Sequence, residues 1–532
     1  MDDHFDVLVI GLGPVGGVLA ALCAQSGLGV LVIDRDTEVY RLPRAVAMDQ
    51  EVLRQVGLIG VADAVLKASR PSEGYEFVNK NRDILVARYQ SGTAPTGYRH
   101  ANLFHQPSFE ESVRTRLTAL PNARVKLGWE LTGLEQNADG VTATIETPAG
   151  ARSVSATYAV GCDGGRSVVR RTIGAGMRDL GFDEPWLVVD VKLAEGVVAL
   201  SDNAMQVCDP DRPTTSTQSG PGRHRWEFML HPGETAEAVT RPESIREWIS
   251  SWVDPDSVTL ERSAVYQFHG LVAETWRDRR IMIIGDAAHQ MPPFLGQGLC
   301  SGVRDAANLA WKLAAVLAGK ADESLLNTVQ YERAPHVMAI TEAAIALGKI
   351  VCITDKDAAQ KRDRQFAADR DAGRPPPFPR MPQIDNGILD DAAAGRVLPE
   401  PFVKSGAGDD VRLDAIAGYA PLLILGNAAE LSARAQAAID RLRELSPELK
   451  VCSLEGGAEG VISVVDAAEH LRSMLGEADA LLAKPDRIVF GSGPLDQLAG
   501  AWQAYLGGDP FLAKNGRPGC DSMPQNLGRA SA

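Results

Sequence analysis

Residues 5–35 read FDVLVIGLGPVGGVLAALCAQSGLGVLVIDR, and this stretch decides the fold. Phe5–Ile10 consists mostly of β-branched or large apolar residues, which predicts a strand buried on both faces. Gly11–Gly16 then forms a G-x-G-x-x-G turn that leads into an apolar helix. A second strand, Val30–Ile33, ends at the acidic Asp34. This order of strand, glycine turn, helix and strand predicts a βαβ unit of a parallel sheet.

Each glycine of the turn has a physical role in binding a dinucleotide. Gly11 permits the tight turn, Gly13 lets a pyrophosphate approach the backbone, and Gly16 lets helix and strand pack closely. The free N–H groups at the start of the helix attract phosphates. Asp34 follows about 20 residues later, where a carboxylate can bind both hydroxyls of a ribose. The expected contacts are Gly11, Gly13, Val15, Gly16, Asp34 and Arg35. An ordinary glycine-rich βα turn is the alternative, and FAD and NAD both stay open as ligands.

The composition fits an enzyme of several domains. The chain has 532 residues, of which 45% are hydrophobic and 23% charged, so two to four domains are expected. Its net charge of −15 argues against a nucleic acid or an anionic membrane surface as a partner. The seven cysteines contain no C-x-x-C, which indicates a cytoplasmic protein with reduced thiols and without a structural metal. A strand beginning at Phe5 leaves no room for a signal peptide, and no apolar run reaches the ~18–20 residues of a membrane span.

Later regions extend the α/β pattern. An apolar strand precedes Cys162–Ser167 (CDGGRS), and residues 280–286 form another strand that ends in Gly-Asp. A proline-glycine loop then leads into a long helix from Gly298, with apolar residues spaced by threes and fours. Between these motifs, residues 181–270 contain alternating segments that predict a separate, sheet-rich domain.

Three motifs in this order carry a family resemblance. They are GLGPVG (11–16), CDGGRS (162–167) and RIMIIGDAAHQMPPFLGQGLCSGVRDAANLAWKL (280–313). Together they resemble the single-component flavin-dependent aromatic hydroxylases, the group A flavoprotein monooxygenases, over about residues 4–345. LPRAVAMDQEVLR (42–54), together with the C-terminal part of the chain, is most similar to 3-(3-hydroxyphenyl)propionate hydroxylases in the phenol hydroxylase branch.

The resemblance implies an α/β fold with three domains. A Rossmann-like FAD-binding domain carries an inserted β-sheet substrate domain and precedes a C-terminal thioredoxin-like domain, which lacks C-x-x-C here and is expected to have no redox role. The expected boundaries are 1–180 and 276–345 for the FAD-binding domain, 181–275 with a contribution from 72–98 for the substrate domain, 346–410 for a helical segment and proline-rich linker, 411–510 for the thioredoxin-like domain, and 511–532 for a disordered tail.

The resemblance also assigns cofactor-binding residues by position. Arg44 and Gln106 match positions close to the FAD phosphates and ribityl chain, and Asp286 would bind ribityl hydroxyls. Asp163 lies in a motif linked to FAD and NAD(P)H, although a helix cap is the alternative for it. The isoalloxazine would be lined by Pro293, Gly296, Gly298 and Leu299, with helix N–H groups facing the edge that becomes negative on reduction.

The implied reaction is ortho-hydroxylation of a monocyclic phenol, with NADH or NADPH as reductant and O2 as oxidant, through a flavin C4a-hydroperoxide. A short acidic side chain on the phenol is expected, with Arg225 as a candidate for pairing with it. Asp49 is the candidate for polarising the phenol, with a helix N-cap as the alternative. His289 is either catalytic or structural. The candidate substrate residues are Arg225, Trp226, Tyr266 and Gln267, and ordinary sheet packing is the alternative for each.

Three other functions are alternatives to aromatic hydroxylation. A flavin halogenase would carry W-x-W-x-I-P, which is not in this sequence. A monooxygenase of the same fold acting on a polyketide, an N-heterocycle or an antibiotic stays open. A flavin-binding module without activity is disfavoured by the second and third motifs. A homodimer is left open as the assembly.

Overall fold

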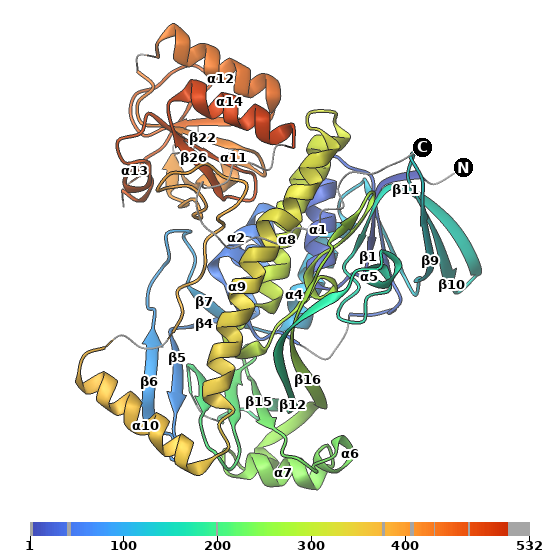
Figure 1. Cartoon of the computed structure of the whole chain (residues 1–532), viewed down its shortest axis with the longest axis vertical. Helices are drawn as coiled ribbons and strands as arrows, with labels where there is room; N and C mark the ends of the chain where they lie inside the picture. The colour runs from blue at the N-terminus through green and yellow to red at the C-terminus, as the bar shows by residue number, and fades with distance from the viewer. Residues whose placement is uncertain are drawn as a thin grey trace.

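The computed structural model describes residues 4–39, 44–197, 201–374, 378–404, 409–429, 431–466 and 469–508. The expected tail at 511–532 lies outside these residues, as do 40–43 of the loop before Arg44 and the prolines 375–377. The described chain arranges two large sheets around long central helices, and the C-terminal unit forms a separate body at one end (Figure 1).

The first sheet contains the predicted βαβ unit. In spatial order it consists of β17 (Arg277–Asp278), β18 (Ile281–Ile283), β11 (Gly150–Gly161), β1 (His4–Ile10), β2 (Val30–Asp34) and β8 (Ala123–Leu127). β18, β11, β1, β2 and β8 run parallel to one another. β10 (Val141–Thr147) pairs antiparallel with β11, and β9 (Glu130–Gln136) pairs antiparallel with β10. Carboxyl ends of parallel strands share one edge, so the glycine turn, Asp34, Asp163 and Asp286 all lie at that edge.

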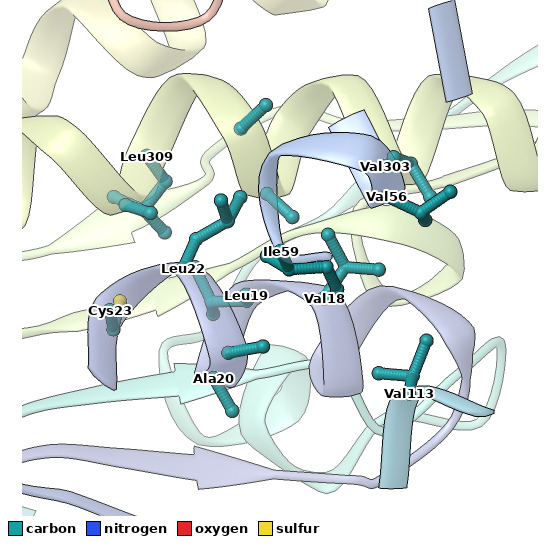
Figure 2. Packing of buried hydrophobic residues seen from close by; sticks show 14 of the residues in the cluster. Val18, Leu19, Ala20, Leu22, Cys23, Val56, Ile59, Val113, Val303 and Leu309 are labelled. Carbon is teal, nitrogen blue, oxygen red and sulfur yellow. The ribbon is translucent and has the colours of Figure 1, made fainter. Parts of the chain in front are cut away.

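The core of this domain lies where α1 (Pro14–Gln25) meets α8 (Gly298–Leu317), α2 (Gln50–Leu58) and α4 (Gln106–Thr118). Val18, Leu19 and Leu22 of α1 pack with Val303 and Leu309 of α8, and all are buried (Figure 2). Each such side chain contributes about 1.5–3 kcal/mol when it is buried. Close packing needs glycines: a Cβ on Gly16 would lie 2.0 Å from the carbonyl oxygen of Gly11.

Most strands of the second sheet come from residues 181–270, the segment that the sequence predicts to be sheet-rich. In spatial order its strands are β19 (His289–Gln290), β16 (Val258–Ala273), β12 (Met177–Leu193), β15 (Arg223–Met229), β14 (Thr214–Gln218), β13 (Ala204–Val207), β5 (Gly74–Val78) and β6 (Ile84–Tyr89). β5 and β6 come from the region 72–98 and join through β13. Two helices, α6 (Ala236–Val239) and α7 (Pro242–Ser250), were not predicted, and Ile245 and Ile249 of α7 cover one face of the sheet.

Long helices connect these parts. α9 (Asn327–Val351) runs beside α8 and is followed by α10 (Lys356–Asp371), which packs near β6 (Figure 1). Smaller elements are α3 (Ala62–Lys67), α5 (Val168–Thr172) and the three-stranded sheet β3 (Ala47–Asp49), β7 (Ala101–Phe104) and β4 (Ser69–Ser72). By length and composition alone, one described helix, Glu323–Val351, could cross a membrane, and half of its apolar window is buried inside this protein.

The C-terminal unit is a small α/β sheet. Its strand order is β24 (Ile462–Ser463), β23 (Lys450–Ser453), β22 (Leu422–Leu425), β25 (Ala480–Ala483) and β26 (Val489–Gly493). β22 and β23 are parallel, whereas β25 is antiparallel to β22 and to β26. The helices are α11 (Leu413–Ala417), α12 (Ala433–Leu445), α13 (His470–Leu475) and α14 (Leu495–Leu506), and a hairpin of β20 (Phe402–Lys404) and β21 (Asp410–Arg412) precedes them. β25 was not predicted, since its sequence, ALLA, favours helices.

Candidate active site

A cavity of about 1530 Å³ lies between the carboxyl edge of the first sheet, one face of the second sheet and the start of α8. All of the predicted cofactor residues except Gly16 line it: Gly11, Gly13, Val15, Asp34, Arg35, Arg44, Gln106, Asp163, Asp286, Pro293, Gly296, Gly298 and Leu299. Asp49, Arg225, Tyr266 and Gln267 line it too. Gly16 lies instead in the contact between the glycine turn and its helix.

Two helices present their first turns to this cavity. α1 follows Gly13 and α8 follows Gln297, and among the described residues no side chain caps either helix. By contrast, Asp49 caps α2 and Ser167 caps α5. Uncapped N–H groups carry partial positive charge and can bind phosphates or an anionic ring edge. A Cβ on Gly13 would meet nothing within 4 Å, so the turn is open to a bulky ligand. These features fit the pyrophosphate and flavin of FAD.

Asp34 both faces the cavity and holds the glycine turn. Its Oδ2 accepts a hydrogen bond of 2.6 Å from the Leu12 N–H, and its Oδ1 accepts one of 2.9 Å from the Asp36 N–H. A carboxylate has about four lone-pair sites, so it can accept further hydrogen bonds from ribose hydroxyls.

Gln106 positions the loop that carries Arg44. Its Oε1 accepts hydrogen bonds of 2.8 Å from the backbone N–H groups of Arg44 and Ala45, and its Nε2 donates to Glu110 Oε1 at 2.8 Å. Nη1 of Arg44 lies 3.7 Å from Oδ2 of Asp286, and both side chains are about half exposed. Burial raises the pKa of Glu110 to about 7. Glu110 was not predicted from the sequence, although its place one helical turn after Gln106 is a signal for it.

Asp163 has the structural role that the sequence left open. Its Oδ1 accepts from the Ser167 hydroxyl at 2.5 Å, and its Oδ2 accepts from the backbone N–H groups of Val168 and Val169 at 2.6 and 3.2 Å. The carboxylate therefore caps α5 while it lines the cavity.

Asp49 is also a helix cap. Its Oδ1 accepts hydrogen bonds of 3.1 Å from the N–H groups of Glu51 and Val52, and its Oδ2 accepts from Arg304. Arg304 further donates to Glu51 at 2.8 Å and to Gln297 at 3.0 Å. Burial acts against the charge of Arg304, but the carboxylates of Asp49 and Glu51 outweigh it and raise its pKa. Arg304, which sequence reasoning missed, thus connects α2 to the start of α8.

The floor of the cavity is one face of the second sheet. There Arg225 is paired with Asp190 through hydrogen bonds of 2.7 and 2.9 Å, and it donates to the backbone oxygen of Arg44 at 2.6 Å. Its charge is therefore matched within the protein. Trp226 is fully buried against α7 on the opposite face, because neighbouring residues of a strand point in opposite directions. The structure therefore places Trp226 outside the cavity.

His289 is buried and hydrogen-bonds through Nε2 to Asp305 at 2.7 Å. Asp305 also accepts from Arg333 at 2.8 Å and from the Gly285 N–H at 3.2 Å. Burial alone would raise the pKa of Asp305, yet His289 and Arg333 lower it to about 2. This cluster holds the Gly285–Asp286 turn through the hydrogen bond from the Gly285 N–H to Asp305. His289 does not line the cavity. Among the described residues no group of three His, Cys, Asp or Glu side chains could hold a metal ion.

Comparison with known proteins agrees with this geometry. The sequence model of the FAD binding domain family matches residues 4–344. A probable NADH-specific resorcinol 4-hydroxylase of Rhodococcus jostii is 36% identical over 489 residues, which cover 91% of each chain. A 3-(3-hydroxy-phenyl)propionate/3-hydroxycinnamic acid hydroxylase of Klebsiella pneumoniae is 33% identical over 515 residues, again 91% of each chain.

Solved structures show the same fold. Aklavinone-11 hydroxylase, in a complex with FAD and aklavinone, is 24% identical and aligns over 95% of this chain and 99% of its own with a TM-score of 0.76. The flavin-dependent monooxygenase PieE is 20% identical and aligns over 95% and 99% with a TM-score of 0.78. The family match, the relatives and the cavity agree, and the chain belongs to the FAD-dependent aromatic hydroxylases, the group A flavoprotein monooxygenases, which use FAD and a nicotinamide reductant.

Proposed function

We propose that this enzyme uses NADH and O2 to hydroxylate a monocyclic phenol ortho to its hydroxyl group. The observation that carries the proposal is a single cavity that joins two uncapped helix starts to a polar sheet floor. The names of the two relatives supply the substrate class, and one of them is NADH-specific. When bound, FAD supplies the redox and oxygen chemistry, and the protein supplies binding and orientation.

The proposed residue roles follow from the contacts of the cavity. The N–H groups of α1 and the open backbone at Gly13 bind the pyrophosphate, Asp34 binds ribose hydroxyls, and Asp286 binds ribityl hydroxyls. The N–H groups that begin α8 stabilise negative charge on the flavin edge. Pro293, Gly296 and Leu299 shape the wall there.

The substrate is proposed to be a phenol with neutral ring substituents, such as a second hydroxyl group. The arginine that the sequence suggested for an acidic side chain, Arg225, is neutralised by Asp190. A buried arginine with a bidentate carboxylate partner has little charge left for a second anion. A phenol with the acidic side chain expected from the sequence, 3-(3-hydroxyphenyl)propionate, is the substrate for comparison.

Measuring oxidation of NADH and NADPH by the FAD-loaded enzyme tests this function. The panel contains resorcinol, 3-(3-hydroxyphenyl)propionate and a fused-ring phenol, with products identified by mass spectrometry. We expect resorcinol to stimulate NADH oxidation most and to gain one oxygen atom. A response to the fused-ring phenol alone would favour a polyketide-type substrate, and no response to any phenol would contradict the proposal.

Asp49 is the second part of the proposal. Its contacts support a role in holding Arg304 and α2, whereas the sequence predicts that it polarises the phenol. Asp49→Asn keeps a capping side chain but removes the charge, and Asp49→Ala removes both. If Asp49 acts on the phenol, both variants should release more peroxide per NADH, because general acid–base help of this kind contributes typically 10²–10⁴-fold. Full coupling in Asp49→Asn would assign Asp49 to structure.

A homodimer and a cytoplasmic location stay proposals from the sequence. Light scattering of the purified enzyme distinguishes a dimer from a monomer of 56.9 kDa.

A further inference from the structure

Arg304 lies where the start of α8 meets the start of α2, and it lines the cavity. Each of its three guanidinium nitrogens donates to a different side chain: Nε to Glu51 at 2.8 Å, Nη1 to Gln297 at 3.0 Å, and Nη2 to Asp49. These three partners line the cavity as well, and the Arg304 side chain is only 10% exposed. A planar guanidinium can hold three partners in fixed directions, which the single ammonium group of a lysine cannot.

Gln297 is the residue directly before α8, and both of its oxygens bind that helix. Its backbone oxygen accepts from the Ser301 N–H at 2.8 Å, and its Oε1 accepts from Arg304, which lies in the second turn of α8. Gln297 and Arg304 therefore form a clamp across the first two turns of the helix. The ion pairs of Arg304 with Asp49 and Glu51 attach this clamp to α2.

The start of α8 needs such support because it lacks the usual stabilising features. Among the described residues no side chain caps it, its first turn contains no acidic residue, and the helix begins with Gly298. A missing cap costs about 0.5–2 kcal/mol. A cap, however, would occupy N–H groups that the proposed function assigns to the flavin edge. The clamp of Gln297 and Arg304 stabilises the first turn without using those N–H groups.

We propose that Arg304 is a positioning residue that, through Gln297, keeps the free N–H groups of α8 directed at the flavin edge. This inference rests on the proposed function for the place of the flavin against α8. Aligned N–H groups stabilise the reduced flavin, whose edge is negative, more than the oxidised flavin. Arg304 therefore raises the reduction potential of the bound FAD, although its own charge is matched by two carboxylates.

The midpoint potential of the bound FAD, measured against a reference dye without any phenol, tests the clamp. Arg304→Lys keeps the positive charge but loses the three directed donors. It is preferred to Arg304→Ala, which would leave two carboxylates unpaired and remove a wall that the active-site cavity shares with another cavity of about 320 Å³. We expect Arg304→Lys to weaken the preference for reduced flavin about three- to tenfold, which lowers the potential by about 15–30 mV.

Gln297→Ala removes the other half of the clamp without a change of charge. It should also lower the potential, and the double variant should lie no lower than the lower of the two single variants, because both substitutions remove the same interaction. Additive shifts, or a wild-type potential in Arg304→Lys, would overturn the proposal. If Arg304→Lys does not fold, a wild-type potential in Gln297→Ala overturns it instead.

Arg277→Lys is the matched control. Arg277 also donates to a carboxylate and to an amide oxygen, those of Glu323 and Asn327, both at 2.6 Å, and its side chain is 12% exposed. It lines neither cavity. Its substitution should lower the melting temperature about as much as Arg304→Lys and leave the potential unchanged. A potential lowered as far as that of Arg304→Lys would overturn the specific role of the clamp.

The phenol panel separates this inference from the proposed function. If a phenol stimulates NADH oxidation but the potentials of all variants equal that of wild type, the clamp is wrong and the function stands. If the potentials shift as expected but no phenol stimulates NADH oxidation, the proposed function fails and the clamp remains.

Discussion

Two groups of charged side chains near α8 differ in how far they are exposed to solvent. At its start, Asp286 and Arg44 lie 3.7 Å apart at the cavity, with side chains 45% and 56% exposed. Further along, Glu332 of α9 accepts hydrogen bonds of 2.9 Å from Lys312 and 2.8 Å from Lys484, and all three side chains are fully buried. The first group is partly exposed and lines the cavity, whereas the second is closed off from solvent.

The buried group joins the C-terminal unit to the rest of the protein. Tyr505 of α14 and Asn308 of α8 also bond to Glu332. A second buried group lies nearby, where Asp414 accepts from Arg54 at 2.7 Å and from Arg487 at 2.8 Å. Other members of these groups are Glu400, Arg412 and Asp486. Buried ion pairs of this kind can specify how parts fit together, whereas exposed charges that line a cavity indicate ligand binding.

Removing the charge of Glu332 should have the largest effect. Glu332→Gln leaves Lys312 and Lys484 buried without their carboxylate, which costs about 3–5 kcal/mol in the free energy of unfolding. Glu342→Gln, at an exposed position of the same helix, should change it by less than about 0.5 kcal/mol. Urea unfolding measures both variants. Equal stability of Glu332→Gln and wild type would mean that the buried group does not hold the two parts together.

Asp286→Ala should affect ligand binding and not the fold. Loss of hydrogen bonds to a charged group should weaken FAD binding about 10- to 100-fold, while the melting temperature of the FAD-free protein should stay close to that of wild type. Fluorescence titration with FAD measures the first and calorimetry the second. Unchanged affinity would remove Asp286 from the cofactor site.

Glu110→Gln should change how stability depends on pH. Glutamate titrates near 4.3 in an unfolded chain, and burial raises the pKa of Glu110 to about 7. Between these values the folded protein binds more protons than the unfolded one, so the free energy of unfolding falls as pH rises, by up to about 1.4 kcal/mol per pH unit. Glu110→Gln should remove this fall, and Glu111→Gln, at an exposed neighbour, should keep it. Parallel curves for all three proteins would contradict the assignment.

Replacement of cysteines in the C-terminal unit should have the smallest effect. Cys452 is fully buried, and burial raises the pKa of its thiol to about 12, so a reactive thiolate does not form there. Cys452→Ala combined with Cys520→Ser should leave NADH turnover within about twofold of wild type. A large loss of turnover with unchanged stability would reveal a thiol function.

The cavity residues that could be predicted from the sequence are those that lie at or just after the ends of strands. Asp34 ends β2 and Asp286 lies in the turn after β18, so both lie at the carboxyl edge of the parallel sheet, where the strand-to-turn pattern of the sequence puts them. The partner of Arg225 did not follow, because Asp190 lies 35 residues away and meets it only through the antiparallel register of β12 and β15. Arg304 was missed because its carboxylate partners lie about 250 positions earlier, separated by 253 and 255 residues.

The bonds of Glu332 have a consequence for the synthesis of the protein. Lys484 and Tyr505 follow Glu332 by 152 and 173 residues, so at 5–20 residues per second they leave the ribosome roughly 8–35 s later. Until then the carboxylate of Glu332 on α9 lacks two of its hydrogen-bond partners. α8 also lacks its contacts with the C-terminal unit, such as those of Asn308 with Asp486 and of Trp311 with Trp502. FAD should therefore be taken up late in translation, and a ribosome-bound chain that ends before Lys484 should not retain it.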